Sequence, residues 1–204
     1  RQPEFTQLDL EMSFVEREDV FRVIERTVTT LYAKLLNKEL PKTFPRMTYK
    51  DALERYGIDK PDTRFGLELF DCSEIVKGSS FKVFSGAIAA GGSVRAIAVP
   101  NGESLTRKQI DELEAVAKDY GAKGLAWIKI QPDGTAAGSA AKFITPDELG
   151  KIKEKGKASA GSLIVFVADK NHVVFAALAR VRLALGKMLN LIDPNRTDVL
   201  WVVD

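Results

Sequence analysis

Three polar side chains, those of Gln7, Asp9 and Glu11, alternate with apolar residues near the start of the chain. Because side chains repeat every second residue along a strand, this alternation predicts a strand over Phe5–Phe14 with an amide and two carboxylates on one face. A carboxylate and an amide held on a rigid sheet can bind an ammonium group, since both accept hydrogen bonds and the carboxylate adds charge complementarity. A solvated outer face of a sheet would give the same pattern, and the alternation alone does not separate the two.

Few other residues offer chemistry, because the chain has one histidine, His172, and one cysteine, Cys72. With one of each, no zinc-ligand spacing can be written and no disulfide can form within the chain, so no metal site is expected. His172 is expected to be a surface or capping side chain rather than a catalytic base. Cys72 is expected to be a small buried residue rather than a nucleophile, in keeping with a reducing cytoplasm.

Four lysines alternate with other residues from Lys151 to Lys157. At the end of a helix such cations interact favourably with the helix dipole, and a solvated helix end is the simpler interpretation. An RNA contact is the alternative, since phosphate binding needs clustered cations. The formal net charge of the whole chain is only +2, so any RNA contact would have to be local.

The composition is that of an ordinary globular protein, with 45% apolar and 28% charged residues among 204. This length suits one large domain or two small ones. No stretch of about eighteen apolar residues occurs and no basic-then-apolar leader opens the chain. We therefore expect neither a membrane span nor secretion, and the cytoplasm is the expected location.

Helices are predicted to follow the polar strand. Apolar residues recur at helical spacing over 17–37, and acidic residues gather at the start of this segment, where the helix dipole favours anions. Thr48, with Asp51 three residues on, predicts the cap of a short helix that ends at Gly57. The segment Asp59–Arg64 is expected to be a loop.

A compact α+β unit of about ninety residues is predicted next, with boundaries near Asp71 and Lys170. Its expected order is strand, strand, helix, strand, helix, strand: Lys82–Ala87, Ser93–Val99, a helix capped by Thr106 and ending near Gly121, Leu125–Ile130, a helix from Thr145 to about Lys155, and Leu163–Ala168. A further short strand is expected near Ala136. The last strand of the unit is nearly all β-branched and aromatic, which predicts burial on both faces. Beyond the unit, Asn171 is expected to cap a helix, and Val199–Val203 is expected to be a strand.

Residues Arg1–Glu11 resemble the second half of motif 2 in class II aminoacyl-tRNA synthetases of the aspartyl and asparaginyl group. Phe44–Tyr49 and Asp59–Arg64 are similar to the segments that come next in the bacterial-type aspartyl enzymes. Leu200–Asp204 looks like the strand where their catalytic domain resumes. The region from Cys72 to Lys170 lies where those enzymes carry the GAD insertion, a domain that also occurs in the tRNA-dependent amidotransferase.

This resemblance implies an α+β fold: part of the antiparallel-sheet catalytic core of a class II synthetase with an inserted α+β GAD domain. Residues 1–70 would belong to the core, 71–170 would form the inserted domain, and 171–204 would return to the core. The chain is thus expected to be an internal fragment. Motif 1, motif 3, the motif 2 arginine and the anticodon-binding barrel are missing from it, so the fragment alone is expected to be inactive.

The resemblance also implies an activity for the parent enzyme: activation of aspartate by ATP to aspartyl-adenylate, followed by transfer to the tRNA for aspartate. The glutamine matching Gln2 contacts ATP in the family, and residues matching Gln7 and Asp9 line the amino-acid pocket. Glu11 shares their face, where a structural hydrogen-bonding role is as good an account. Mg²⁺ would be bound by the phosphates and by acidic residues absent here, and the parent is expected to be a homodimer.

Two other functions are left open by the sequence. The insert could act as a tRNA-binding or partner-binding module without catalysis. An amidotransferase component is the third alternative, but it would leave the residues from Gln2 to Glu11 without an explanation. Whether the parent also charges the tRNA for asparagine does not follow from these residues.

Overall fold

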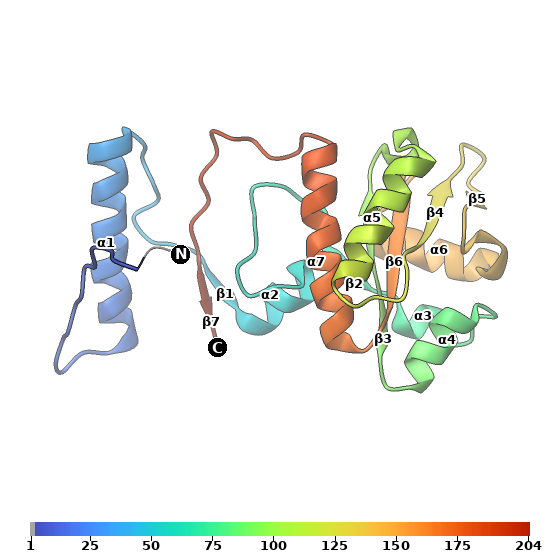
Figure 1. Ribbon diagram of the computed structural model, residues 1–204, viewed down its shortest axis with the longest axis horizontal. Helices are drawn as coiled ribbons and strands as arrows, with labels where there is room; N and C mark the ends of the chain where they lie inside the picture. Colours follow the sequence, from blue (N-terminus) through green and yellow to red (C-terminus); the bar gives the residue numbers. More distant parts are fainter. Residues whose placement is uncertain (1–2) are drawn as a thin grey trace. The chain divides into compact units, whose positions relative to one another are not determined.

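The computed structural model describes residues 3–204 and divides into two compact units (Figure 1). The smaller unit contains the chain up to Arg46 together with Val199–Trp201. The larger unit contains Met47–Asp198 and Val202–Asp204. A strand β1 (Arg46–Thr48) and a strand β7 (Trp201–Val203) form a two-stranded sheet.

The smaller unit is built around one long helix, α1 (Arg17–Leu36), which confirms the helix predicted over 17–37. The carboxylate of Asp19 accepts a hydrogen bond from the backbone N–H of Glu16, which has no partner within the helix because it lies at the helix start. This hydrogen bond, together with the one from the Arg22 guanidinium, lowers the pKa of Asp19. Asn37 ends the helix in the left-handed conformation.

The strand predicted over Phe5–Phe14 is wrong as an element of this structure. The segment from Pro3 to Glu16 has no strand assignment, and all its side chains are exposed. A strand is stabilised by hydrogen bonds to a neighbouring strand, and none of the described residues supplies such a neighbour to this segment. The alternation of side chains is present in the sequence, but alternation alone does not provide a partner.

The larger unit contains a five-stranded antiparallel sheet in the order β2-β3-β6-β4-β5. Its strands are β2 (Leu69–Asp71), β3 (Ser93–Val99), β4 (Ala126–Ile130), β5 (Ala136–Ala137) and β6 (Leu163–Asp169). Its helices are α2 (Tyr49–Tyr56), α3 (Ser73–Val76), α4 (Lys82–Ala89), α5 (Arg107–Asp119), α6 (Pro146–Lys155) and α7 (Asn171–Met188), with short 3₁₀ turns at Gly102–Ser104 and Ala141–Phe143. This unit confirms the predicted α+β class.

Helices cover both faces of this sheet, with α5 and α7 on one side and α3, α4 and α6 on the other (Figure 1). The central strand β6 contributes alternate residues to the two cores. Leu163, Val165 and Val167 belong to the α5/α7 core, while Ile164 and Phe166 belong to the other. Burial on both faces, as predicted from the composition of this strand, is confirmed.

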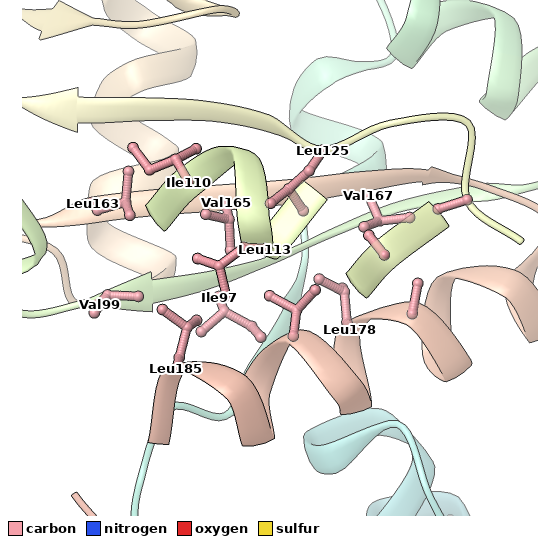
Figure 2. Close-up of a cluster of buried hydrophobic side chains, with 14 of the residues drawn as sticks. Ile97, Val99, Ile110, Leu113, Leu125, Leu163, Val165, Val167, Leu178 and Leu185 are labelled. Carbon is pink, nitrogen blue, oxygen red and sulfur yellow. The ribbon is translucent and has the colours of Figure 1, made fainter. Parts of the chain in front are cut away.

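Figure 2 shows the α5/α7 core, where side chains from the sheet lie between the two helices. Ile97 and Val165 from the strands meet Leu113 of α5, and Leu178 and Leu185 of α7 close the cluster. All five are fully buried. This core fixes α7 on the sheet, so the helix predicted after residue 170 packs on strands that lie before residue 170.

The strand predicted over Lys82–Ala87 is wrong, because this segment is the helix α4. Phe81, Phe84 and Ile88 are spaced by three and four residues, which places them on one side of a helix, with Phe84 fully buried. Gly91, at φ +76°, lies in the turn that joins this helix to β3.

The remaining predicted elements agree with the structure in type. Thr48, Thr106 and Thr145 accept hydrogen bonds from the backbone N–H groups of Asp51, Gln109 and Glu148, as expected of helix caps. The helix predicted from Asn171 is present, but its cap is Lys170 and Asn171 is the first helical residue. The boundaries predicted near Asp71 and Lys170 stay a prediction.

Candidate functional site

The predicted site residues lie in the exposed segment of the smaller unit. Gln7, Asp9 and Glu11 are all exposed, and no hydrogen bond or ion pair engages their side chains among the described residues. Their acceptor oxygens are therefore available to a ligand. Gln2, the predicted ATP contact, lies outside the described residues.

A hollow of about 470 Å³ lies beside this segment, within the smaller unit. Leu8, Leu10 and Met12 line it from the segment, and the apolar residues Val20, Val23 and Ile24 of α1 line it from the helix. Glu11 is also at its wall, whereas Gln7 and Asp9 are not. Glu11 is thus placed with the apolar residues, apart from the two residues predicted to bind the amino acid.

A buried carboxylate, that of Glu25, binds several segments of the smaller unit, and the sequence analysis did not identify it. Its Oε1 accepts three hydrogen bonds: from the backbone N–H of Phe44 at 3.1 Å, from the Arg46 guanidinium at 2.7 Å and from the Trp201 indole at 2.9 Å. The side chain is 3% exposed. One carboxylate therefore ties α1 to two segments that are remote in sequence.

The charge on Glu25 is favoured by its partners. Burial opposes ionisation, but the hydrogen bonds from Phe44, Trp201 and Arg46 outweigh it and lower the pKa of Glu25. Arg46 also binds Glu18 at 2.8 Å, and its guanidinium lies 4.7 Å from the centre of the Phe21 ring. The Phe21 ring in turn stacks on Trp201 at 4.2 Å. The ion pairs, hydrogen bonds and ring stacking thus hold α1, the segment 44–46 and Trp201 together.

In the larger unit, the predicted loop Asp59–Arg64 is held by its own ion pairs. Asp62 accepts two hydrogen bonds from the Arg64 guanidinium, at 2.9 and 2.7 Å, which lower its pKa. Thr63 donates to Asp198 at 2.9 Å. Arg196 pairs with the same Asp198 and donates to the carbonyl of Arg64 at 3.2 Å. The loop is therefore connected to a segment more than a hundred residues further along the chain.

The next stretch of this loop is bound by Arg182 of α7, a second residue that the sequence analysis missed. Its guanidinium donates to the carbonyls of Phe65, Gly66 and Leu67, at 2.7, 2.7 and 3.1 Å. It also lies 4.0 Å from the ring centre of Phe65 and 4.8 Å from that of Tyr56. Burial lowers the pKa of Arg182 to about 10.

One signal could have identified Arg182 in advance. It stands four residues after Leu178 and three before Leu185, so it occupies the apolar side of α7. A charged residue at such a position must find hydrogen-bond acceptors inside the protein. The sequence could indicate that a partner exists, but not that the partner is the backbone of 65–67.

The minor candidates have structural roles. Cys72 is fully buried, as predicted, and burial raises the pKa of its thiol to about 12. His172 is exposed on the first turn of α7. Lys151 forms an ion pair with Asp147 at 2.7 Å, as a solvated helix surface would. Within the described residues 3–204, no group of three histidine, cysteine, aspartate or glutamate side chains could hold a metal ion, and no helix is long and apolar enough to cross a membrane.

Part of the chain matches a known domain. Residues 84–178 match the GAD domain. The predicted insert, 71–170, overlaps this match but begins and ends earlier along the chain. Because the match extends well into α7, it includes residues that pack in the core shown in Figure 2.

The whole chain is also similar to curated bacterial enzymes. It is 49% identical over 204 residues to an aspartate–tRNA(Asp/Asn) ligase of Caldanaerobacter subterraneus, covering all of this chain and 34% of that enzyme. It is 48% identical over 204 residues to enzymes of Aquifex aeolicus and Clostridium botulinum, named aspartate–tRNA(Asp/Asn) ligase and aspartate–tRNA ligase, with the same coverage. The chain thus spans about a third of the length of these relatives. It contains a GAD domain and corresponds over its whole length to a segment of the bacterial aspartate–tRNA ligases.

Proposed function

We propose that the protein to which this chain belongs activates aspartate with ATP and transfers the aspartyl group to its tRNA. The observation that carries the proposal is the near 50% identity to aspartate–tRNA ligases over all 204 residues, including the segment with Gln7 and Asp9. Identity confined to the GAD domain would fit an amidotransferase component equally well. Similarity over both units favours the synthetase.

In this proposal Asp9 and Gln7 bind the ammonium group of aspartate. Both side chains are exposed and without partners in the described chain, so each can accept a hydrogen bond from the substrate. The negative charge of Asp9 complements the ammonium and orients the amino acid for attack by its own carboxylate on the α-phosphorus of ATP, which breaks the bond to the β-phosphate and releases pyrophosphate. Gln2 would contact ATP. Such an in-line displacement needs positioning and charge neutralisation rather than a protein nucleophile.

Mg²⁺, when bound, would neutralise charge on the phosphates of ATP. In this proposal the chain's own residues bind and orient the amino acid and contact ATP. The chain alone is expected to be inactive. The parent is proposed to be a homodimer in the cytoplasm.

The test is aspartate-dependent exchange of pyrophosphate into ATP by the full-length protein. We expect exchange with aspartate and none with asparagine or lysine, and Asp9→Asn should lower kcat/KM for aspartate at least about thirtyfold, the effect of removing one partner from a charge-assisted pair. Asp119→Asn, which changes an exposed carboxylate at the end of α5, is the matched control and should leave exchange unchanged. Exchange driven by another amino acid, or an equal loss in both variants, would contradict the proposal.

A further inference from the structure

A small hollow of about 220 Å³ lies in the larger unit, between the start of α4, the turn before β4 and the sheet. Its lining includes the aromatic side chains of Phe81, Phe84 and Phe166 and the polar side chains of Lys123 and Ser139. None of these residues takes part in the aspartate and ATP contacts proposed above. The hollow is therefore not part of the aspartate-binding site proposed above.

The aromatic rings form a connected platform at this hollow. Phe81 stacks on Phe143 with ring centres 4.8 Å apart and meets the edge of Phe84 at 4.8 Å. Phe84 then contacts Phe166 at 5.4 Å. Phe84 and Phe166 are fully buried, whereas Phe81 is only half-buried, so Phe81 is the most exposed of the three aromatic residues that line the hollow. Neighbouring Val83 is 51% exposed, which leaves the entrance apolar.

The charge around the hollow is positive. Lys123 at its wall is exposed and has no acidic partner among residues 3–204. Lys142 is also exposed, and its ammonium lies 4.9 Å from the centre of the Phe143 ring, without an ion pair in the described chain. The one carboxylate at the wall, Glu114, is neutralised by Lys118 at 2.6 Å. Lys123 thus lies at the wall of the hollow, and Lys142 lies beside the Phe143 ring that stacks on Phe81.

The size of the hollow limits what it can hold. Pockets for complete small ligands are usually about 300–1,000 Å³, so this one suits a single ring system. An acidic peptide could pair with Lys123 and Lys142, but its carboxylates would make no stacking contact with the Phe81 ring. A nucleotide uses both, because its base stacks on an aromatic ring while its phosphates attract cations.

We propose that this hollow binds one unstacked base of a single-stranded RNA end, with the base against Phe81 and the flanking phosphates near Lys123 and Lys142. The inference rests on the proposed function in one respect: the RNA in the cell would be the tRNA substrate. It gives the GAD domain a contact point for RNA that is separate from the aspartate-binding segment and from the Lys151–Lys157 run.

The test is ultraviolet cross-linking of single-stranded RNA of about six nucleotides, oligo(A) or oligo(C), to the full-length protein, with the linked peptides identified by mass spectrometry. We expect links at Phe81, which lines the hollow. Phe81→Leu, which keeps an apolar side chain but removes the ring, should weaken RNA binding about tenfold. The double change Lys123→Glu and Lys142→Glu should also reduce the salt dependence, by about 1.4 in the slope of log K against log salt for two phosphates.

Lys108→Glu is the matched charge control, because it alters an exposed lysine at the opposite end of α5 from Lys123. It should leave the cross-links in place and the salt slope nearly unchanged. Links that map elsewhere, a salt slope that Lys108→Glu lowers by half as much as the double change or more, or competition by a polyglutamate peptide as effective as that by RNA would overturn the inference.

The two proposals fail separately. Aspartate-dependent exchange of pyrophosphate requires no RNA, so exchange without links at this hollow removes only the RNA site. Links at the hollow in a protein without exchange activity support the RNA site and remove the synthetase.

Discussion

Replacing Arg182 by methionine should release the loop 65–67 from α7. Methionine preserves an unbranched apolar side chain between the rings of Tyr56 and Phe65, but it donates no hydrogen bond. The carbonyls of Phe65, Gly66 and Leu67 would each lose their donor. The change therefore tests the hydrogen bonds of Arg182 while retaining most of its packing.

The loss of unfolding free energy depends on how deeply each of the three carbonyls is buried. A hydrogen bond from a charged donor contributes about 1.5–3 kcal/mol, and the bond to Phe65 is the buried one. The other two are partly buried, so water can replace some of what is lost. We therefore expect Arg182→Met to lower the free energy of unfolding by about 3–4 kcal/mol. Arg182→Lys, which retains the charge but loses the planar fork of guanidinium donors, should cost about 2 kcal/mol.

The assay is hydrogen exchange with urea unfolding, both on the full-length protein. Because the chain has two compact units, a single global transition cannot be assumed, and exchange resolved by peptide locates the loss. Faster exchange should appear first at residues 65–71, since β2 continues from this loop. Arg180→Met is the control, because Arg180 lies on the same helix, its guanidinium lies 4.9 Å from the centre of the exposed Tyr120 ring, and it donates to none of the carbonyls of 65–67.

Equal losses in Arg182→Met and Arg180→Met would refute the reasoning, since the two changes differ in the three carbonyl contacts. Unchanged exchange over 65–71 in a destabilised Arg182→Met protein would refute it as well. In that case Arg182 would act through helix packing rather than through the loop.

Three further predictions concern single residues. The folded-state pKa of Glu25 is lowered, so its contribution to folding stability is present above the unfolded pKa of about 4.3 and is lost as the pH falls through the folded value. Trp201 fluorescence should therefore change below about pH 4.3, and Glu25→Gln should remove that change while Glu39→Gln keeps it. Cys72, buried and with its pKa raised to about 12, should resist iodoacetamide at pH 8 until the protein unfolds, and modification of the folded protein seen by mass spectrometry would contradict its burial. Thr145→Ala should lower the unfolding free energy by about 1 kcal/mol by removing the cap of α6, and an unchanged urea midpoint would show that the cap contributes nothing.

The candidate site was predicted from local pattern, and the structure adds its surroundings. The types and spacing of Gln7, Asp9 and Glu11 suit either an ammonium-binding site or a solvated sheet face, and the amino-acid pocket was implied by the resemblance to class II synthetases. Their alternation did not show that Glu11 lies at an apolar hollow together with Leu10, because that depends on how the segment packs along α1. Their assignment to aspartate stays a prediction.

The sequence by itself determined the features whose causes lie within a few residues. The caps at Thr48, Thr106 and Thr145 need only a backbone N–H three positions away, and the nearly continuous apolar run of β6 can be stable only with both faces covered. The α+β class follows from such local signals taken together.

Only the tertiary structure decided the features that depend on a distant partner. Phe5–Phe14 lacks a neighbouring strand among the described residues, and α4 is helical because its apolar residues meet a core supplied by β3 and β6. Glu25 and Arg182 are stable as buried charges because acceptors and donors reach them from segments up to 176 residues away. A charge or an alternating pattern is written in the sequence, but the group that satisfies it is brought close only by folding.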